Sequence, residues 1–299
     1  MVCISHIPPM QFPARPWPTG LAQQCEPLVC RVLATNPSAF SYTGTQSYIV
    51  GAAGKVAVID PGPADDAHVE ALIAAIGDAE VAAIMCTHTH HDHSPAAAPL
   101  AKATGAPIIG CAPFSLKDDG PRADAGFDPS YQPDMVLADG QSLEGPDWTL
   151  RAVWTPGHTS NHLCYALEES GALFSGDHVM GWSTTVVSPP DGDMTDYMAS
   201  LQLLQTRQDR VYYPAHGEAV TNPKQLVRGM IGHRRQRENQ ILKLLNQGVG
   251  VIEQMVPQMY KGIDQQLWPA AGRSVTAHLI DLERRSMVRR SEAGWAIVQ

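Results

Sequence analysis

Short apolar runs alternate with segments of helical periodicity along the first 110 residues of the chain. Apolar runs that end in turn residues predict strands, and alanine-rich stretches with apolar residues three and four positions apart predict helices. Ser94 is predicted to cap the second helix and Gly105 to end it. The predicted strands are 29–34, 46–51, 55–60, 81–86 and 107–110, and the predicted helices are 64–76 and 95–104.

The pattern changes between residues 112 and 147, where Pro, Gly and Asp are frequent. This composition predicts a loop region with little regular structure that flanks a functional site. Regular patterning then returns and predicts strands at 148–154, 162–167, 172–174 and 210–213, with a helix at 193–204.

A different pattern begins at residue 224. A long basic helix is predicted to about residue 246, followed by helices at 251–260 and 274–285 and a strand at 295–298. This order is typical of a small winged-helix-like module. The apolar side of the long helix carries Leu226, Met230, Ile241, Leu244 and Leu245.

Charge separates the same two parts of the chain. Residues 1–223 hold 9 Lys and Arg against 24 Asp and Glu, a net of −15, whereas residues 224–299 hold 12 against 6, a net of +6. We therefore expect a catalytic domain over 1–223 and a second module over 224–299, with the basic module docked on its acidic neighbour or holding RNA phosphates. Docking is the favoured interpretation for the arginines, which are Arg234, Arg235, Arg237, Arg284, Arg285, Arg289 and Arg290.

Composition predicts a soluble protein. Hydrophobic residues make up 44% and charged residues 17%, and no run approaches the roughly 18 apolar residues of a membrane span. The N-terminus lacks a basic start followed by an apolar stretch, so a cytoplasmic location is expected. Six scattered cysteines without a Cys-x-x-Cys pair indicate reduced thiols, mostly packed inside.

The run from His88 to His93 carries the strongest chemical signal. His88 and His90 place two imidazoles on one side of an extended segment, and Asp92 with His93 adds a second pair as the chain turns. Imidazole and carboxylate are good ligands for zinc and similar ions, so six residues can serve two metals. Alternation points His91 away from His90, and we assign it no ligand role.

More distant ligands are expected in glycine-flanked turns at predicted strand ends, where His158, Asp177 and His216 stand. An imidazole pair with one distant His leaves an open position for water, which is typical of a catalytic ion. An Asp that gives one oxygen to each of two ions would hold them close enough to share a hydroxide. The histidines interpreted as structural or solvated are His6, His68, His162, His178, His233 and His278.

These residues resemble the motifs of the metallo-β-lactamase superfamily, whose His-x-His-x-Asp-His sequence is matched by residues 88–93. The resemblance implies an α+β fold, a four-layer αββα sandwich with the metals at one edge. It also implies that Asp60 orients a ligand from outside the coordination sphere. The implied ligand sets are His88, His90 and His158 for one ion, Asp92, His93 and His216 for the other, and Asp177 as the bridge.

Differences within the superfamily narrow the expected chemistry. Position 177 is Asp where one subclass of true β-lactamases has Cys, which disfavours antibiotic hydrolysis. Position 90 is His where diiron oxygen reductases have Glu, which disfavours redox chemistry. The 39 positions between Asp177 and His216 leave no room for the inserted cap domain of the nucleases. Residues 176–181, 196–201 and 213–217 resemble the glyoxalase II-like branch, and nearly the whole chain is similar to the β-lactamase-like protein 2 group, which carries a C-terminal winged-helix-like module.

The sequence thus predicts a hydrolase that uses a hydroxide bridging two divalent ions, with zinc favoured over manganese or iron. Asp92 would orient the hydroxide and carry a proton to the leaving group, and Asp177 would hold both ions. The expected substrate is a small ester, thioester or lactone. Two alternatives stay open, an endoribonuclease acting on single-stranded RNA and a metal-binding regulator that uses the C-terminal module on DNA. No membrane partner is expected, and a homo-oligomer is compatible with the sequence.

Overall fold

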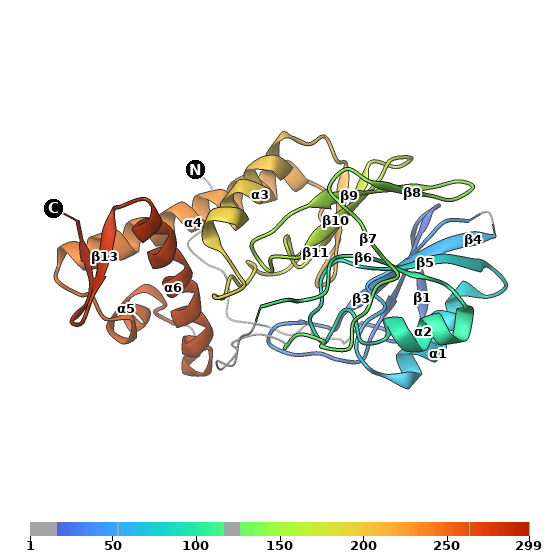
Figure 1. Ribbon diagram of the computed structural model, residues 1–299, viewed down its shortest axis with the longest axis horizontal. Helices are drawn as coiled ribbons and strands as arrows, with labels where there is room; N and C mark the ends of the chain where they lie inside the picture. Colours follow the sequence, from blue (N-terminus) through green and yellow to red (C-terminus); the bar gives the residue numbers. More distant parts are fainter. Residues whose placement is uncertain (1–16, 53, 117–125, 263, 299) are drawn as a thin grey trace.

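The computed structural model describes residues 17–52, 54–116, 126–262 and 264–298. Cys3 and His6 lie outside these residues. Two β-sheets pack face to face, and helices cover the outer face of each sheet (Figure 1). The first sheet is antiparallel up to its fourth strand and parallel beyond it. In spatial order its strands are β1 (Ala22–Glu26), β2 (Val29–Leu33), β3 (Gln46–Val50), β4 (Lys55–Ile59), β5 (Glu80–Cys86), β6 (Ile108–Gly110) and β7 (Met135–Val136).

The second sheet faces the first through a continuous apolar core. Tyr48 and Met85 of the first sheet belong to one buried cluster with Tyr165 and Phe174 of the second. Its strands, in spatial order, are β12 (Val211–Pro214), β11 (Ala172–Gly176), β10 (Leu163–Leu167), β9 (Thr149–Trp154) and β8 (Ser142–Glu144).

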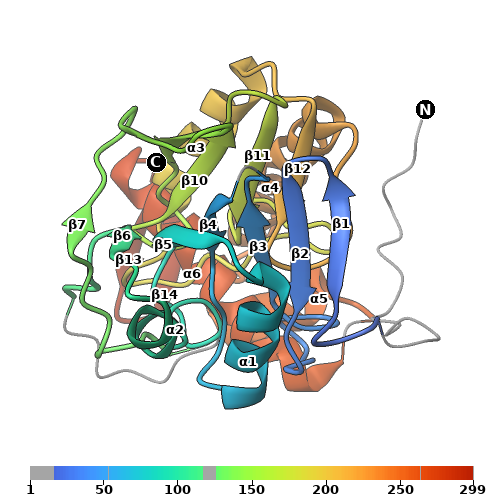
Figure 2. The same cartoon turned by 90° about the vertical axis from the view of Figure 1, so that its right-hand side faces the viewer.

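Two pairs of helices form the outer layers. Helices α1 (Asp66–Ile76) and α2 (Ala97–Thr104) cover the first sheet (Figure 2). Helices α3 (Met194–Thr206) and α4 (Pro223–Asn246) pack on the second sheet through a separate buried cluster. The predicted α+β, four-layer αββα arrangement is therefore confirmed.

The cap predicted for α2 is wrong. The helix begins at Ala97 with Ala96 as its N-cap and no side-chain capping bond. The Ser94 hydroxyl instead donates to Asp128, 3.0 Å away, so it ties the histidine run to the loop region. Gly105 does end the helix, in the left-handed conformation at φ 73°, which glycine adopts without strain.

Several short strands were not predicted. Strands β7 and β8 lie inside the region expected to have little regular structure, and β1 lies at the edge of the first sheet. Edge strands bury few side chains, so their sequences lack the alternation that marks a half-buried strand. The other described parts of that region, including 112–116 and 126–134, contain no helix or named strand, as expected, and residues 117–125 lie outside the described residues.

The C-terminal module has the predicted winged-helix character. The last turns of α4 pack with α5 (Ile252–Met259), α6 (Trp268–Arg284) and a terminal hairpin around their own apolar cluster. The helix predicted at 274–285 begins earlier, at Trp268, directly after the 3-10 turn η1 (Gln265–Leu267). The hairpin strands are β13 (Val288–Ser291), which was not predicted, and β14 (Gly294–Ile297).

Polar contacts join this module to the preceding part of the chain at the N-terminal end of α3. Arg284 of α6 forms an ion pair with Asp193, and the Thr195 hydroxyl donates to Asp281 at 2.7 Å. Intramolecular contacts also engage Arg234, Arg237 and Arg285. Arg234 and Arg284 reach residues before 224, which agrees with the docking interpretation, whereas Arg237 and Arg285 contact residues of the module itself.

None of the helices in the described part of the chain is both long and apolar enough to cross a membrane.

Because His278 of α6 is buried, we expect the free energy of unfolding to fall in mild acid. Burial, followed by the charge of Arg234, lowers the pKa of His278 from 6.5 to about 3. Between these two pH values the unfolded chain binds a proton that the folded chain does not. Each pH unit of acidification below 6.5 should therefore remove up to about 1.4 kcal/mol of unfolding free energy through this residue.

The measurement is urea unfolding of the metal-stripped protein at pH 7, 6 and 5, compared with His278→Leu. The variant is expected to lose less stability per pH unit. Identical pH slopes for the two proteins would show that His278 does not contribute to the acid sensitivity.

Candidate metal centre

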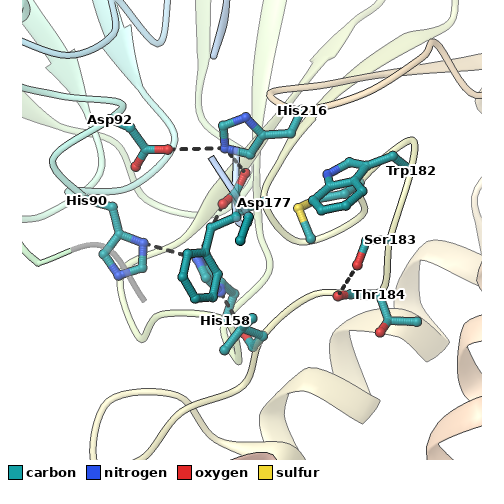
Figure 3. Close-up of a pocket in the computed structure, with 12 residues that line it drawn as sticks. His90, Asp92, His158, Asp177, Trp182, Ser183, Thr184 and His216 are labelled. Atoms are coloured by element: carbon teal, nitrogen blue, oxygen red, sulfur yellow. Dashed lines mark hydrogen bonds and ion pairs between the residues drawn. The ribbon is translucent and has the colours of Figure 1, made fainter. Parts of the chain in front are cut away.

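Seven predicted ligands meet at one edge of the sandwich. The run 88–93 follows β5, His158 follows β9, Asp177 follows β11 and His216 follows β12. Figure 3 shows His90 and Asp92 from one loop and His158, Asp177 and His216 from three others, all pointing toward one another. All of them except Asp92 are buried, and the Asp92 carboxylate is partly exposed.

Three imidazoles form the first donor group. His90 Nδ1 lies 3.0 Å from His88 Nε2 and 3.2 Å from His158 Nε2. The ligand atoms of all three lie within 4.8 Å of one another. Three nitrogens converging at such distances fit the face of a metal coordination sphere.

The second group combines two imidazoles and a carboxylate. His216 Nε2 lies 3.2 Å from Asp92 Oδ2, and His93 Nε2 lies 3.6 Å from Asp92 Oδ1. Asp177 stands between the groups, with Oδ1 3.3 Å from His216 Nε2 and Oδ2 3.7 Å from His158 Nε2. One carboxylate therefore faces both groups.

Hydrogen bonds on the far side of four rings set their tautomers. The carbonyls of Val186 and Gly44 lie 2.7 and 3.1 Å from Nδ1 of His158 and His216, and a carbonyl can only accept. Each Nδ1 therefore carries a proton, and Nε2 is the nitrogen that faces the site. This outer support is the usual arrangement around metal-binding histidines.

Asp60 and Thr87 provide the same support for His88 and His93. Asp60 is buried and accepts from the Thr87 amide at 2.7 Å, the Thr87 hydroxyl at 2.8 Å and His93 Nδ1 at 3.1 Å. Because the Thr87 hydroxyl donates to Asp60, it accepts from His88 Nδ1, 3.0 Å away. In both rings Nδ1 is engaged by this support, and Nε2 is the nitrogen that faces the site. Asp60 therefore lies where it can orient His93 by a hydrogen bond from outside the coordination sphere, as expected.

The charged and neutral side chains of the site favour the binding of cations. Burial lowers the pKa of His88 and His90 well below 6.5, with further lowering by neighbouring imidazoles, so both are neutral donors. Burial also acts on His216, but Asp177 and Asp92 outweigh it and raise the pKa of His216 to about 10. The carboxylates therefore place a negative potential where cations would bind, and the donor set suits divalent metals.

The other histidines are not members of the donor groups, although the His162 ring lies 5.2 Å from that of His88 and its Nε2 accepts from the Asp177 amide at 3.3 Å. His91 is exposed, as expected, and its amide donates to the Gly126 carbonyl. Of those interpreted as structural, His68, His162, His178 and His278 are buried and His233 is half-buried, and none belongs to a donor group among the described residues.

A pocket opens beside the candidate metal ligands, and sequence patterns did not identify its wall. Phe40, Met180 and Trp182 line it together with Ala39 and Val186. The Trp182 ring stacks on Tyr42 with ring centroids 4.8 Å apart, and Tyr42 has a left-handed backbone at φ 57°. Phe127 from the loop region packs on the His90 ring at 4.6 Å.

Comparison with known proteins agrees with this geometry. The Metallo-beta-lactamase superfamily profile matches residues 42–216, and the Beta-lactamase associated winged helix domain matches residues 252–295. The chain belongs to the metallo-β-lactamase superfamily. The predicted division at 223/224 falls between the two matched segments and stays a prediction.

Relatives of this superfamily member include the Beta-lactamase-like protein 2 homolog of Drosophila melanogaster, 33% identical over 89% of this chain and 91% of the relative. An atrochrysone carboxyl ACP thioesterase of Aspergillus fumigatus is 34% identical over 73% of this chain and 65% of its own length. Among solved structures, a Beta-lactamase domain protein from Burkholderia ambifaria aligns with a TM-score of 0.75 at 19% identity, covering 94% of each chain. Superfamily membership and the His and Asp groups identify a hydrolase with sites suited to divalent metals.

Proposed function

We propose that the protein hydrolyses the thioester, or a related ester or lactone, of an apolar acyl group, using two divalent ions. The observation that carries the proposal is the position of the two donor groups at the base of a pocket with an apolar wall. Binding there would place a carbonyl next to the metals and the acyl group against Phe40, Met180 and Trp182.

We assign one ion to His88, His90 and His158 and the other to Asp92, His93 and His216. Asp177 would bridge them, and the separate approach of its two oxygens to His216 and His158 supports this role. Zinc is favoured because imidazole nitrogen dominates the donor set, and manganese or ferrous iron would also accept these ligands.

Divalent ions held in this way supply an activated water at neutral pH and polarise the scissile carbonyl. The side chains of the protein would position the water and the substrate. Asp92 is the most solvent-exposed of the ligands, with 19% of its side chain accessible, and lines the pocket. Its carboxylate would orient the attacking water and pass a proton to the leaving group.

The pocket lining favours an acyl substrate over RNA. Among the described residues that form it, none is Lys or Arg, whereas a strand of RNA needs cations along its phosphates. The relative from Aspergillus fumigatus is named a thioesterase, which makes a carrier-bound thioester the first substrate class to test.

The test is metal analysis of the purified protein followed by assays of the same sample on acyl thioesters, lactones, a β-lactam and single-stranded RNA. Hydrolysis of thioesters with apolar acyl groups, at two metals per chain, is the expected result. Cleavage of RNA with no thioester hydrolysis would refute the proposal and favour the endoribonuclease alternative.

Replacing Trp182 with alanine tests the acyl wall. Loss of an aromatic face that contacts the acyl group should raise KM about 10-fold for benzoyl or octanoyl thioesters and much less for acetyl thioesters. Trp154→Ala is the matched control, because Trp154 is exposed and does not line this pocket. An equal effect of Trp182→Ala on short and long acyl groups would contradict the assignment of the wall.

A further inference from the structure

The segment that follows Asp177 returns to support the metal centre. The Thr185 hydroxyl lies 2.8 Å from the Asp177 carbonyl oxygen and 3.0 Å from that of His178. The next residue, Val186, supplies the carbonyl that accepts from His158 Nδ1 at 2.7 Å. Two adjacent residues therefore hold the backbone of one candidate ligand and the ring orientation of another.

A buried arginine of the C-terminal module holds this segment from behind. Arg234, on α4, is only 4% exposed, and its guanidinium donates to the Thr185 carbonyl. Its guanidinium carbon also lies 5.0 Å from the centroid of the Tyr197 ring, and the Tyr197 hydroxyl donates to the His178 carbonyl at 3.1 Å. Arg234 thus meets the segment directly and through α3.

The electrostatics of Arg234 are unusual for a purely structural residue. Within the described chain it forms no ion pair with a carboxylate, although burying a guanidinium without one is costly. Its main partners are a backbone carbonyl and an aromatic face. Because the Thr185 hydroxyl donates to the Asp177 carbonyl and the adjacent Val186 carbonyl accepts from His158, this contact is linked to two candidate ligands.

We propose that Arg234 is a positioning residue for the metal centre, acting through Thr185 on Asp177 and His158. The module that bears the winged helix would thereby set the metal affinity of the catalytic domain. The inference rests on the ligand roles of Asp177 and His158 in the proposed function and is independent of the substrate.

The experiment measures metal affinity by competition with a chromophoric chelator, using zinc and the full-length chain. Arg234→Met keeps the apolar stem and removes the donor, and it should weaken zinc binding about 10-fold, in the range known for outer support of metal ligands. Arg235→Met is the matched control, because Arg235 is the exposed neighbour on the same helix. Circular dichroism at the assay temperature shows whether each variant is folded.

Thr185→Val tests the link between Arg234 and the candidate ligands at Thr185 itself. It replaces Arg234→Met in the experiment if that variant does not fold. It removes the hydroxyl bonds to Asp177 and His178 while keeping the carbonyl that Arg234 contacts, and it should weaken zinc binding to a similar extent. The double variant should lose less affinity than the product of the two single effects, because both act on one network.

Zinc affinities within twofold of the Arg235→Met control for either folded variant would overturn the proposal, as would strictly multiplicative effects in the double variant. Loss of thioester hydrolysis is not used as the readout. If the protein proves inactive on thioesters but the zinc affinities change as expected, the proposed function fails and the positioning role stands.

Discussion

Replacing Asp177 with alanine is expected to remove one metal equivalent per chain and to reduce hydrolysis by at least about 10²-fold. The carboxylate faces both donor groups, so in the proposed site its loss would take a ligand from each ion and lower the negative charge that balances them. Metal analysis by mass spectrometry and steady-state kinetics on an acyl thioester measure the two effects.

Asp66→Asn is a suitable control, because Asp66 is an exposed carboxylate at the start of α1. It should keep wild-type activity and metal content. An Asp177→Ala protein that retained both metal equivalents would show that Asp177 does not bridge, whatever happened to its activity.

The second large effect is expected for Asp60→Asn, which changes one oxygen to an amide. An amide nitrogen in place of Oδ2 cannot accept from the Thr87 hydroxyl or from His93 Nδ1. His93 would then place its proton on Nε2, the atom that faces the metal site. The wrong tautomer should weaken metal binding by about 10- to 100-fold while the fold is retained.

Chelator competition measures this change, and thermal unfolding of the metal-stripped protein reports the fold. Asp66→Asn again provides the comparison, with the same chemical change at an exposed site. A wild-type metal affinity in Asp60→Asn would mean that the hydrogen bond to His93 does not control its tautomer.

The local part of the site could be predicted because its ligands are close in sequence. His88 and His90 converge across 3.0 Å since an extended backbone places alternate side chains on one side. His158, Asp177 and His216 were recognisable at strand ends, where glycine-flanked turns bring loops to one edge of a sandwich.

Ser94 shows why local rules fail next to the site. Its position before a helix predicts a cap, but Asp128 from the loop region accepts its hydroxyl proton and no capping bond forms. The missing signal lies 34 residues away in the chain. Strands β1, β7 and β8 were overlooked for a related reason, since pairing at a sheet edge leaves little trace in the hydrophobic pattern.

The sequence by itself determined the winged-helix module through its periodicity and the metal-ligating residue types through their spacing at strand ends. The two-sheet sandwich followed from the resemblance of these motifs to the metallo-β-lactamase superfamily. Only the tertiary structure decided which protons the imidazoles carry, that Phe40 and Trp182 form the pocket wall, and that Arg234 reaches Thr185. Those features depend on contacts between segments far apart in the chain, and no local pattern encodes the distance between them.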